Sequence, residues 1–276
     1  MGSDDLGDTL TAEVIGSFVD TPDPRLREIL TSLVRHLHDF GREVRLTQEE
    51  WERGIDFLTA LGQKGDATRQ EWVLCSDVLG MSMLVETMAG GHRAGATEGT
   101  VLGPFHMVES PERRSGDTID LVGAGQPCVV EVRVLTVDGA PLGNATVDVW
   151  QANEQGFYDV QQPEIQPPGN GRGLFRADEQ GLVWFRTVEP SPYPIPTDGP
   201  VGTLLELTRR HPYRPAHIHF MVTAPGYETL TTHIFVAGSP YLDSDAVFAV
   251  KGGLIVEFTG DSNQNRHASV DLVLAL

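Results

Sequence analysis

The chain has 276 residues, of which 40% are hydrophobic, so it can bury a sizeable core. Its formal net charge of −19 argues against nucleic acid and anionic membrane surfaces as partners, because both would repel it. No segment approaches the ~18 unbroken apolar residues of a membrane span, and Met1–Leu6 lacks the basic and apolar regions of a signal peptide. We therefore expect a soluble, cytoplasmic protein.

The first third of the chain has helical periodicity. Apolar residues recur at helical spacing over residues 24–41. Thr47 and Glu50 match a capping box that opens a second helix, ending near two glycines. A third helix is predicted from about Thr68 to Met88, where a pair of glycines follows.

From about residue 100, β-rich runs alternate with Gly, Pro, Asn and Asp. Such short strands are typical of a sandwich or barrel. We expect an α+β protein, with a helical region over residues 1–96 and a mainly antiparallel β-sandwich over residues 97–276. The two cysteines have different contexts, which favours free thiols over a disulfide. The predicted strands are 129–135, 145–150, 182–188, 217–223, 230–236, 254–258 and 269–275.

A His-x-His pair, His217 and His219, lies in one of these predicted strands. Residues i and i+2 of a strand point to the same face, so both imidazoles can bind one metal ion. Zinc, copper, nickel and iron all accept imidazole, so the pair does not select the metal. A bare pair of this kind is about as often two unrelated histidines on a polar strand face.

Two of the five tyrosines have unusual surroundings. Tyr158 follows Gly156 and Phe157 just beyond a predicted strand, and Tyr193 lies between prolines that restrict the backbone. Composition alone favours an aromatic plug in a proline-rich loop over a metal ligand.

Three motifs taken together resemble the intradiol dioxygenase family, which includes catechol, hydroxyquinol and protocatechuate dioxygenases. They are residues 156–159 (GFYD), 193–196 (YPIP) and 214–219 (RPAHIH), and they occur in the family's order and approximate spacing. A fourth, residues 97–105 (TEGTVLGPF), is similar to the segment that precedes the sandwich in the hydroxyquinol branch. The resemblance extends from the second helix to the C-terminus, and four ordered motifs are far more specific than any one.

The resemblance implies a non-haem iron enzyme that opens an aromatic diol or triol ring with O₂. It implies that one Fe(III) per chain is held by Tyr158, Tyr193, His217 and His219. Two phenolates are hard, anionic donors that favour Fe(III). The expected substrate is hydroxyquinol, cleaved to 3-hydroxy-cis,cis-muconate or maleylacetate, and catechol, giving cis,cis-muconate, is the alternative.

Three residues are expected to act on the bound ring. Tyr193 takes a proton from the substrate, and Arg214 stabilises negative charge on it, as a planar guanidinium beside an aromatic ring does. His233 stands where the family commonly has glutamine. We expect it beside the metal ligands and not as a fifth ligand, with a titratable group that glutamine lacks.

The substrate pocket implied by the resemblance includes Asp77. A carboxylate among apolar neighbours could accept a hydrogen bond from the third hydroxyl of hydroxyquinol, whereas catechol would leave it unpaired at a cost of ~1–3 kcal/mol. An exposed aspartate on an amphipathic helix is the alternative. The predicted pocket residues are Leu74, Asp77, Val101, Leu102, Gly103, Pro104, Phe105, Ile195, Pro196 and Val247.

The N-terminal helices have more apolar surface than one side of a sandwich can cover. In the family, equivalent helices form a homodimer interface, often with a bound phospholipid, and we expect the same here. Two other classes stay open on the residues alone. They are a zinc or copper enzyme that uses the His-x-His pair, and a non-catalytic β-sandwich that binds a small molecule.

Overall fold

The computed structural model describes residues 3–66, 69–90, 94–106, 109–260 and 265–276. The chain separates into two compact units, Met1–Thr59 and Ala60–Leu276. The functional division predicted between residues 96 and 97 stays a prediction.

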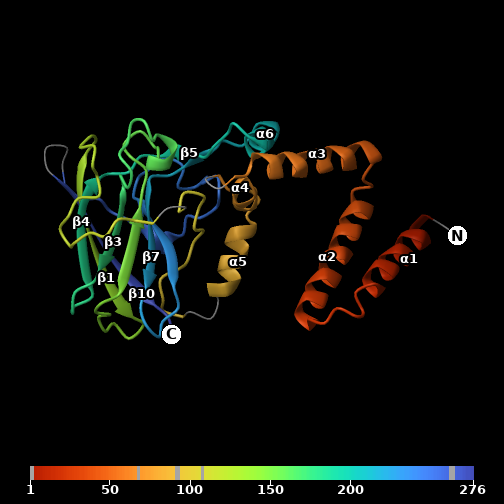
Figure 1. Ribbon diagram of the computed structural model, residues 1–276, viewed down its shortest axis with the longest axis horizontal. Helices are drawn as coiled ribbons and strands as arrows, with labels where there is room; N and C mark the ends of the chain where they lie inside the picture. The colour runs from red at the N-terminus through yellow and green to blue at the C-terminus, as the bar shows by residue number, and fades with distance from the viewer. Residues whose placement is uncertain (1–2, 67–68, 91–93, 107–108, 261–264) are drawn as a thin grey trace. The chain divides into compact units, whose positions relative to one another are not determined.

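The first unit is helical, with α1 (Ser3–Gly16), α2 (Pro24–Glu43) and most of α3 (Gln48–Lys64) (Figure 1). The predicted capping box is confirmed. The Thr47 amide donates to Glu50 Oε2 at 2.9 Å, and the Glu50 amide donates to Thr47 Oγ1 at 3.3 Å. Helix α1 was not predicted, because its sequence has no continuous apolar stripe.

The predicted third helix is wrong as a single element. It forms two helices, α4 (Glu71–Val78) and α5 (Met81–Gly90), bent by 73°. The break is at Gly80, whose φ of +75° is the left-handed conformation that ends a helix. No single helix in the described ranges is long and apolar enough to cross a membrane. By length and composition only, α4 and α5 together pass that test.

The second unit is built on two sheets, which confirms the predicted α+β sandwich. One sheet has the order β10-β1-β4, and the other has the order β3-β2-β7-β8-β9. Only the β1–β10 and β8–β9 pairs are parallel among the paired strands described. The strands are β1 (Pro127–Thr136), β2 (Thr146–Trp150), β3 (Arg172–Arg176), β4 (Leu182–Val188), β7 (His217–Thr223), β8 (Leu230–Val236), β9 (Ile255–Val256) and β10 (Arg266–Leu274).

Short elements complete this unit. The two-residue strands β5 (Tyr193–Pro194) and β6 (Tyr213–Arg214) pair with each other. Between them lies α6 (Pro200–Leu207), and two 3₁₀ turns, η1 (Asp159–Gln161) and η2 (Gly252–Leu254), lie in loops. Strand β3 and helix α6 were not predicted. In β3 the sequence is Arg-Gly-Leu-Phe-Arg, which lacks a clear strand pattern.

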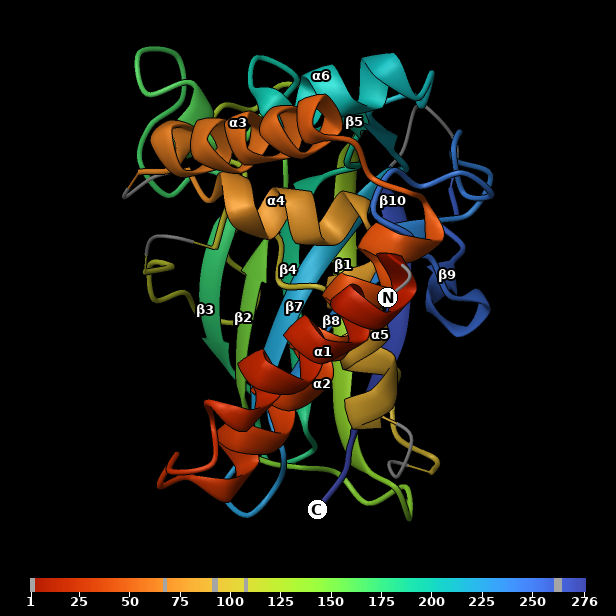
Figure 2. The ribbon, with the colours of Figure 1, turned by 90° about the vertical axis from the view of Figure 1, so that its right-hand side faces the viewer.

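Alternation along β7 separates the core from the candidate site. Ile218, Phe220 and Val222 belong to the core cluster that also takes in side chains of β1 and β4. His217 and His219 therefore project from the opposite face of the five-stranded sheet. Helices α4 and α5 lie over that face (Figures 1 and 2). Cys75 and Cys128 are both buried free thiols, as predicted.

Candidate active site

Strand β7 holds two imidazole nitrogens close together. The Nε2 atoms of His217 and His219 are 3.2 Å apart, and both side chains are at most 2% exposed. His217 Nδ1 lies 2.7 Å from the carbonyl oxygen of Pro215, to which it donates. The lone pair of His217 is therefore on Nε2 and faces the site.

Two phenols complete this donor set. Tyr158 immediately precedes η1, and Tyr193 lies on β5, opposite Arg214 of β6. Their hydroxyl oxygens are 3.3 Å apart, and the Tyr193 hydroxyl is 3.4 Å from His217 Nε2. The structure thus brings together four residues that are up to 61 positions apart in the sequence, from Tyr158 to His219.

The donor set fits a metal ion. Donor atoms that share an ion at about 2.0–2.2 Å lie roughly 3 Å from one another, as these do. Burial raises the pKa of both phenols, that of Tyr158 well above its ordinary value, so neither ionises without a positive charge nearby. Burial and then neighbouring cationic or imidazole groups lower the pKa of His217 and His219, which keeps them neutral and able to bind a metal.

His233 and Arg214 lie beside the four donors. Ligand atoms of His217, His219 and His233 all lie within 4.8 Å of one another. Arg214 Nη1 is 3.1 Å from His217 Nε2, and both Nη1 and Nη2 are 3.4 Å from His233 Nε2. Since a guanidinium only donates, His233 Nε2 accepts, and Nδ1 donates to Thr100 Oγ1. Both ring nitrogens of His233 therefore have protein partners, as those of His217 also do. That His233 is not a metal ligand stays a prediction.

A single segment, residues 100–106, crosses the outer face of the sheet above these donors. The Thr100 amide donates to the Thr231 carbonyl on β8 at 2.9 Å. At the other end, His106 Nε2 is 2.9 Å from Asp148 Oδ2 on β2. Between them, Gly103 has a φ of +75°, and a Cβ there would lie 3.2 Å from Cε1 of His219. Only glycine allows the chain to pass this close to the His219 ring in this conformation.

Most of the predicted pocket residues belong to this segment or line cavities next to it. A cavity of about 370 Å³ is lined by Asp77, Val101, Leu102 and Gly103, among others. A second, of about 350 Å³, is lined by Leu74, Pro104, Phe105 and Pro196, among others. Ile195 and Val247 are both buried and line neither of these two cavities.

Asp77 is buried, which argues against the exposed-aspartate alternative. Its side chain is on α4 and is only 1% exposed, and Oδ1 has no hydrogen-bond partner among the described residues. Burial raises its pKa to about 6, although Ser82 and the charge of Arg214 act in the opposite direction. An unpaired carboxylate oxygen in a cavity wall is well placed to accept a hydrogen bond from a ligand hydroxyl.

Several contacts around the site were missed by the sequence reasoning, including those of the predicted pocket residue Phe105. Trp150 stacks on His219, with ring centroids 4.8 Å apart. Phe105 stacks on Tyr158 at 4.5 Å, and buried Arg172 donates to the Phe105 carbonyl at 2.9 Å and to Asp159 Oδ1 at 2.8 Å. These contacts join distant parts of the chain, so no local pattern could have indicated them, although Phe105 and Asp159 lie inside the motifs.

Comparisons with known proteins agree with this geometry. Residues 103–275 match the family model described as Dioxygenase, and residues 23–97 match the model described as Catechol dioxygenase N terminus. The chain is 51% identical to 6-chlorohydroxyquinol 1,2-dioxygenase of Cupriavidus pinatubonensis over 96% of each chain. It is also 51% identical to hydroxyquinol 1,2-dioxygenase of Rhizobium sp., over 89% of this chain and 83% of the relative. The solved structure of hydroxyquinol 1,2-dioxygenase from Pseudomonas putida DLL-E4 has a TM-score of 0.89 and 45% identity, covering 99% of both chains.

The chain belongs to the intradiol ring-cleavage dioxygenase family, and it is an oxygenase. Within that family it is similar to the relatives named for hydroxyquinol or its chlorinated form. The His-x-His pair and the two tyrosines form a cluster suited to the metal site of such an enzyme.

The raised pKa of Asp77 predicts a pH-dependent effect on stability. The neutral carboxyl is favoured in the fold, so the wild type loses stability as pH rises from 3.8 through about 6. Asp77→Asn stays neutral, so its free energy of unfolding at pH 8 should exceed that of the wild type by up to about 3 kcal/mol. Below pH 4 the two proteins should be equally stable. Urea titrations at both pH values measure this, with Asp138→Asn on an exposed turn as the control. Equal stability of wild type and Asp77→Asn at pH 8 would contradict it.

Proposed function

We propose that the chain cleaves hydroxyquinol with O₂ between two hydroxyl-bearing carbons, using one Fe(III) per chain. The product is 3-hydroxy-cis,cis-muconate or its keto form, maleylacetate. One observation carries the proposal, namely that the hydroxyls of Tyr158 and Tyr193 meet Nε2 of His217 and His219 in a buried cluster. The hydroxyquinol enzymes among its relatives support the choice of substrate.

Tyr158, Tyr193, His217 and His219 would hold the iron. Bound Fe(III) would stabilise the two phenolates and withdraw electron density from a diol that chelates it. Tyr193 would take a proton from a substrate hydroxyl at its phenolic oxygen. This oxygen suits that task, because its burial raises the pKa of the phenol and so makes the phenolate a stronger base.

Arg214 and His233 would act together on the deprotonated ring. Arg214 is 2% exposed, so water screens its charge little, and its Nη1 faces the metal ligands. His233 Nε2 accepts from both terminal nitrogens of the guanidinium and so limits its rotation. The guanidinium sets this tautomer because it can only donate, and the Thr100 hydroxyl accepts from Nδ1. His233 therefore does the work that a glutamine oxygen could do at the same position.

A visible spectrum with an iron assay is the first test of the iron site. We expect a red protein with about one iron per chain, because phenolate-to-Fe(III) charge transfer absorbs visible light, and a band shift when hydroxyquinol is added without O₂. Tyr158→Phe removes one phenolate and should weaken the colour. Tyr241→Phe should leave it, because the Tyr241 ring packs on Tyr213 and His211 and not on any of the four donors in the contacts described. A colourless protein after iron reconstitution would exclude the tyrosine ligands and favour zinc, or a binding protein without metal.

Asp77 gives a test of substrate choice. Asp77→Leu removes the acceptor for the third hydroxyl, so kcat/KM for hydroxyquinol should fall about 10- to 100-fold, while that for catechol should stay within about threefold or rise. Initial rates with both diols measure the change in ratio. A parallel loss for both substrates would show that Asp77 does not distinguish them, and a wild type that prefers catechol would make catechol the substrate.

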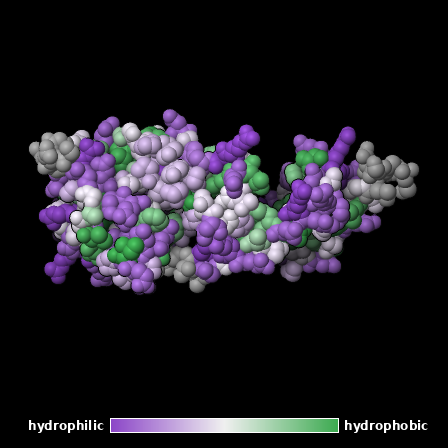
Figure 3. Space-filling view, turned by 90° about the horizontal axis from the view of Figure 1, so that it is seen from above, coloured by the Kyte–Doolittle hydropathy of each residue, from purple (hydrophilic) through white to green (hydrophobic). Residues whose placement is uncertain are grey.

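We also propose that the helical region, residues 1–96, forms a homodimer interface and that residues 97–276 are the catalytic domain. Helix α2 has no buried residue, and its exposed apolar residues recur at helical spacing as a stripe. Seen from above, hydrophobic groups are exposed among hydrophilic ones (Figure 3). The same stripe could hold the acyl chains of a phospholipid, as the family resemblance implies. The exposed apolar residues of α2 include Leu26, Ile29, Leu33, Leu37 and Phe40. We also propose that the protein is cytoplasmic.

The dimer is tested by its mass in solution. Light scattering should give twice the chain mass for the wild type. Leu33→Glu places a charge on the apolar stripe and should shift the mass toward that of one chain. Arg35→Gln changes the net charge by the same amount on the opposite face of α2 and should leave the dimer intact. A wild type that is monomeric at all concentrations would contradict the proposal.

A further inference from the structure

We infer that Asp245 is the positioning residue for Arg214, and that it fixes this guanidinium and the turn 245–249 to each other. The inference rests on the proposed function, because it assumes that Arg214 acts on the bound ring. Neither the motifs nor the pocket residues considered above include Asp245.

The Asp245 carboxylate contacts the edge of the Arg214 guanidinium that carries Nε and Nη2. Arg214 Nε donates to Oδ1 at 3.2 Å, and Nη2 lies 3.5 Å from Oδ2. Both side chains are nearly inaccessible, at 3% and 2% exposed. A two-point contact of this kind fixes the plane of the guanidinium, whereas a single contact leaves it free to rotate. The outer edge is thereby directed at His217 and His233.

The same carboxylate organises the turn that follows it. The Val247 amide donates to Oδ1 at 3.3 Å, and the Ala249 amide donates to Oδ2 at 3.0 Å. Between these two residues, Phe248 has a φ of +59°, a left-handed conformation that a bulky aromatic residue rarely adopts. Two hydrogen bonds to one carboxylate help to hold the chain in this conformation.

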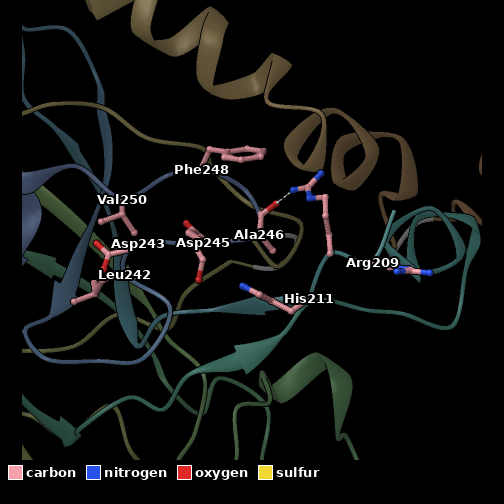
Figure 4. A pocket seen from close by; sticks show the side chains of 10 residues that line it. Arg209, His211, Leu242, Asp243, Asp245, Ala246, Phe248 and Val250 are labelled. Atoms are coloured by element: carbon pink, nitrogen blue, oxygen red, sulfur yellow. Dashed lines mark hydrogen bonds between the residues drawn. The ribbon is translucent and has the colours of Figure 1, made fainter. Parts of the chain in front are cut away.

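Arg210 connects this turn to the helix that carries Asp77. It donates from Nη1 to the Val78 carbonyl at 2.6 Å and from Nη2 to the Ala246 carbonyl at 2.9 Å. Its guanidinium also lies 4.9 Å from the ring centre of Phe248. Asp245, Ala246 and Phe248 line a cavity of about 460 Å³. Figure 4 shows these three side chains and, as a dashed line, the hydrogen bond that the Ala246 carbonyl accepts. The turn thus links Arg214 to the end of α4.

Asp245 is also the counter-charge of Arg214. The other groups around the guanidinium are the imidazoles of His217 and His233, which are neutral and accept from it, and the phenol of Tyr193. Within the described part of the chain, Asp245 is the carboxylate that forms an ion pair with Arg214. A buried cation without a partner would be costly, so its charge and its orientation depend on the same residue.

An amide cannot replace this carboxylate. Each Asp245 oxygen accepts from one guanidinium nitrogen and one backbone amide. In Asp245→Asn, one of the two positions becomes an NH₂ group that faces two donors and can accept from neither. The substitution therefore releases one side of Arg214 and one amide of the turn, with almost no change in side-chain volume.

A double-mutant cycle between Asp245→Asn and Arg214→Gln, made in the full-length iron-loaded enzyme, tests the inference. In the wild-type background we expect Asp245→Asn to lower kcat for hydroxyquinol about 10- to 100-fold at unchanged iron content. In the Arg214→Gln background it should change kcat by less than about threefold, since no guanidinium remains to be positioned. KM should rise by a similar factor in both backgrounds, because the turn is released in both.

Asp243→Asn is the matched control. It makes the same chemical change two residues away, on an exposed part of the same loop, and should leave kcat and KM unaltered. Equal losses of kcat in both backgrounds would show that Asp245 acts independently of Arg214 and would overturn the inference, as would an unchanged kcat in the wild-type background. If Asp245→Asn does not retain iron, Asp245→Glu takes its place in the cycle, with the same two criteria. Wild-type enzyme without iron or ring cleavage refutes the proposed function itself, a result that the spectrum and assay reveal before any variant is made.

Discussion

Strand β7 is buried on both of its faces. Ile218 and Phe220 on one side belong to the core of the sandwich, and His217 and His219 on the other are covered by the segment 100–106 and by the loops that carry the tyrosines. Because the side-chain period of a strand is two, the residues that stabilise the sandwich and those that form the donor set alternate along the same backbone. The spacing of the imidazoles is thus determined by a strand whose own position the core fixes.

Burial determines which side chains of the site are charged and which are neutral. Arg214 and Arg172 are each paired with a buried carboxylate, Asp245 and Asp159. The phenols and imidazoles are held neutral by the same desolvation, so the cluster is polar but lacks the positive charge that its oxygen donors need. The multivalent cation proposed for this site would supply it. Asp77 also has a buried carboxylate oxygen without a partner among the described residues, which suits its proposed role in recognising a substrate hydroxyl.

The sequence was most informative where a local pattern and a structural role coincide. The strands that include β1, β4, β7 and β8 follow from alternation, and the capping box at Thr47 follows from two residues three positions apart. The proposed metal ligands required the ordered motifs, because sequence geometry alone could not connect the tyrosines with the His-x-His pair. The break at Gly80 was hidden in an apolar run. No local pattern could predict the partners of Arg214 and His233, since Asp245 is 31 residues from Arg214 and Thr100 is 133 residues from His233 in the sequence.

The segment 100–106 limits how this enzyme could acquire new substrates. Its residues line the cavities, but Gly103 also touches His219, and Thr100 holds His233. A substitution here that reshapes the pocket would also shift the surroundings of the proposed iron ligands, so substrate range and metal affinity would not vary independently along this stretch. Substitutions on helix α4 can alter the pocket alone, because α4 lines the cavities and makes no described contact with the donor set. Natural or engineered changes of specificity should therefore accumulate on α4, while the crossing segment remains nearly constant.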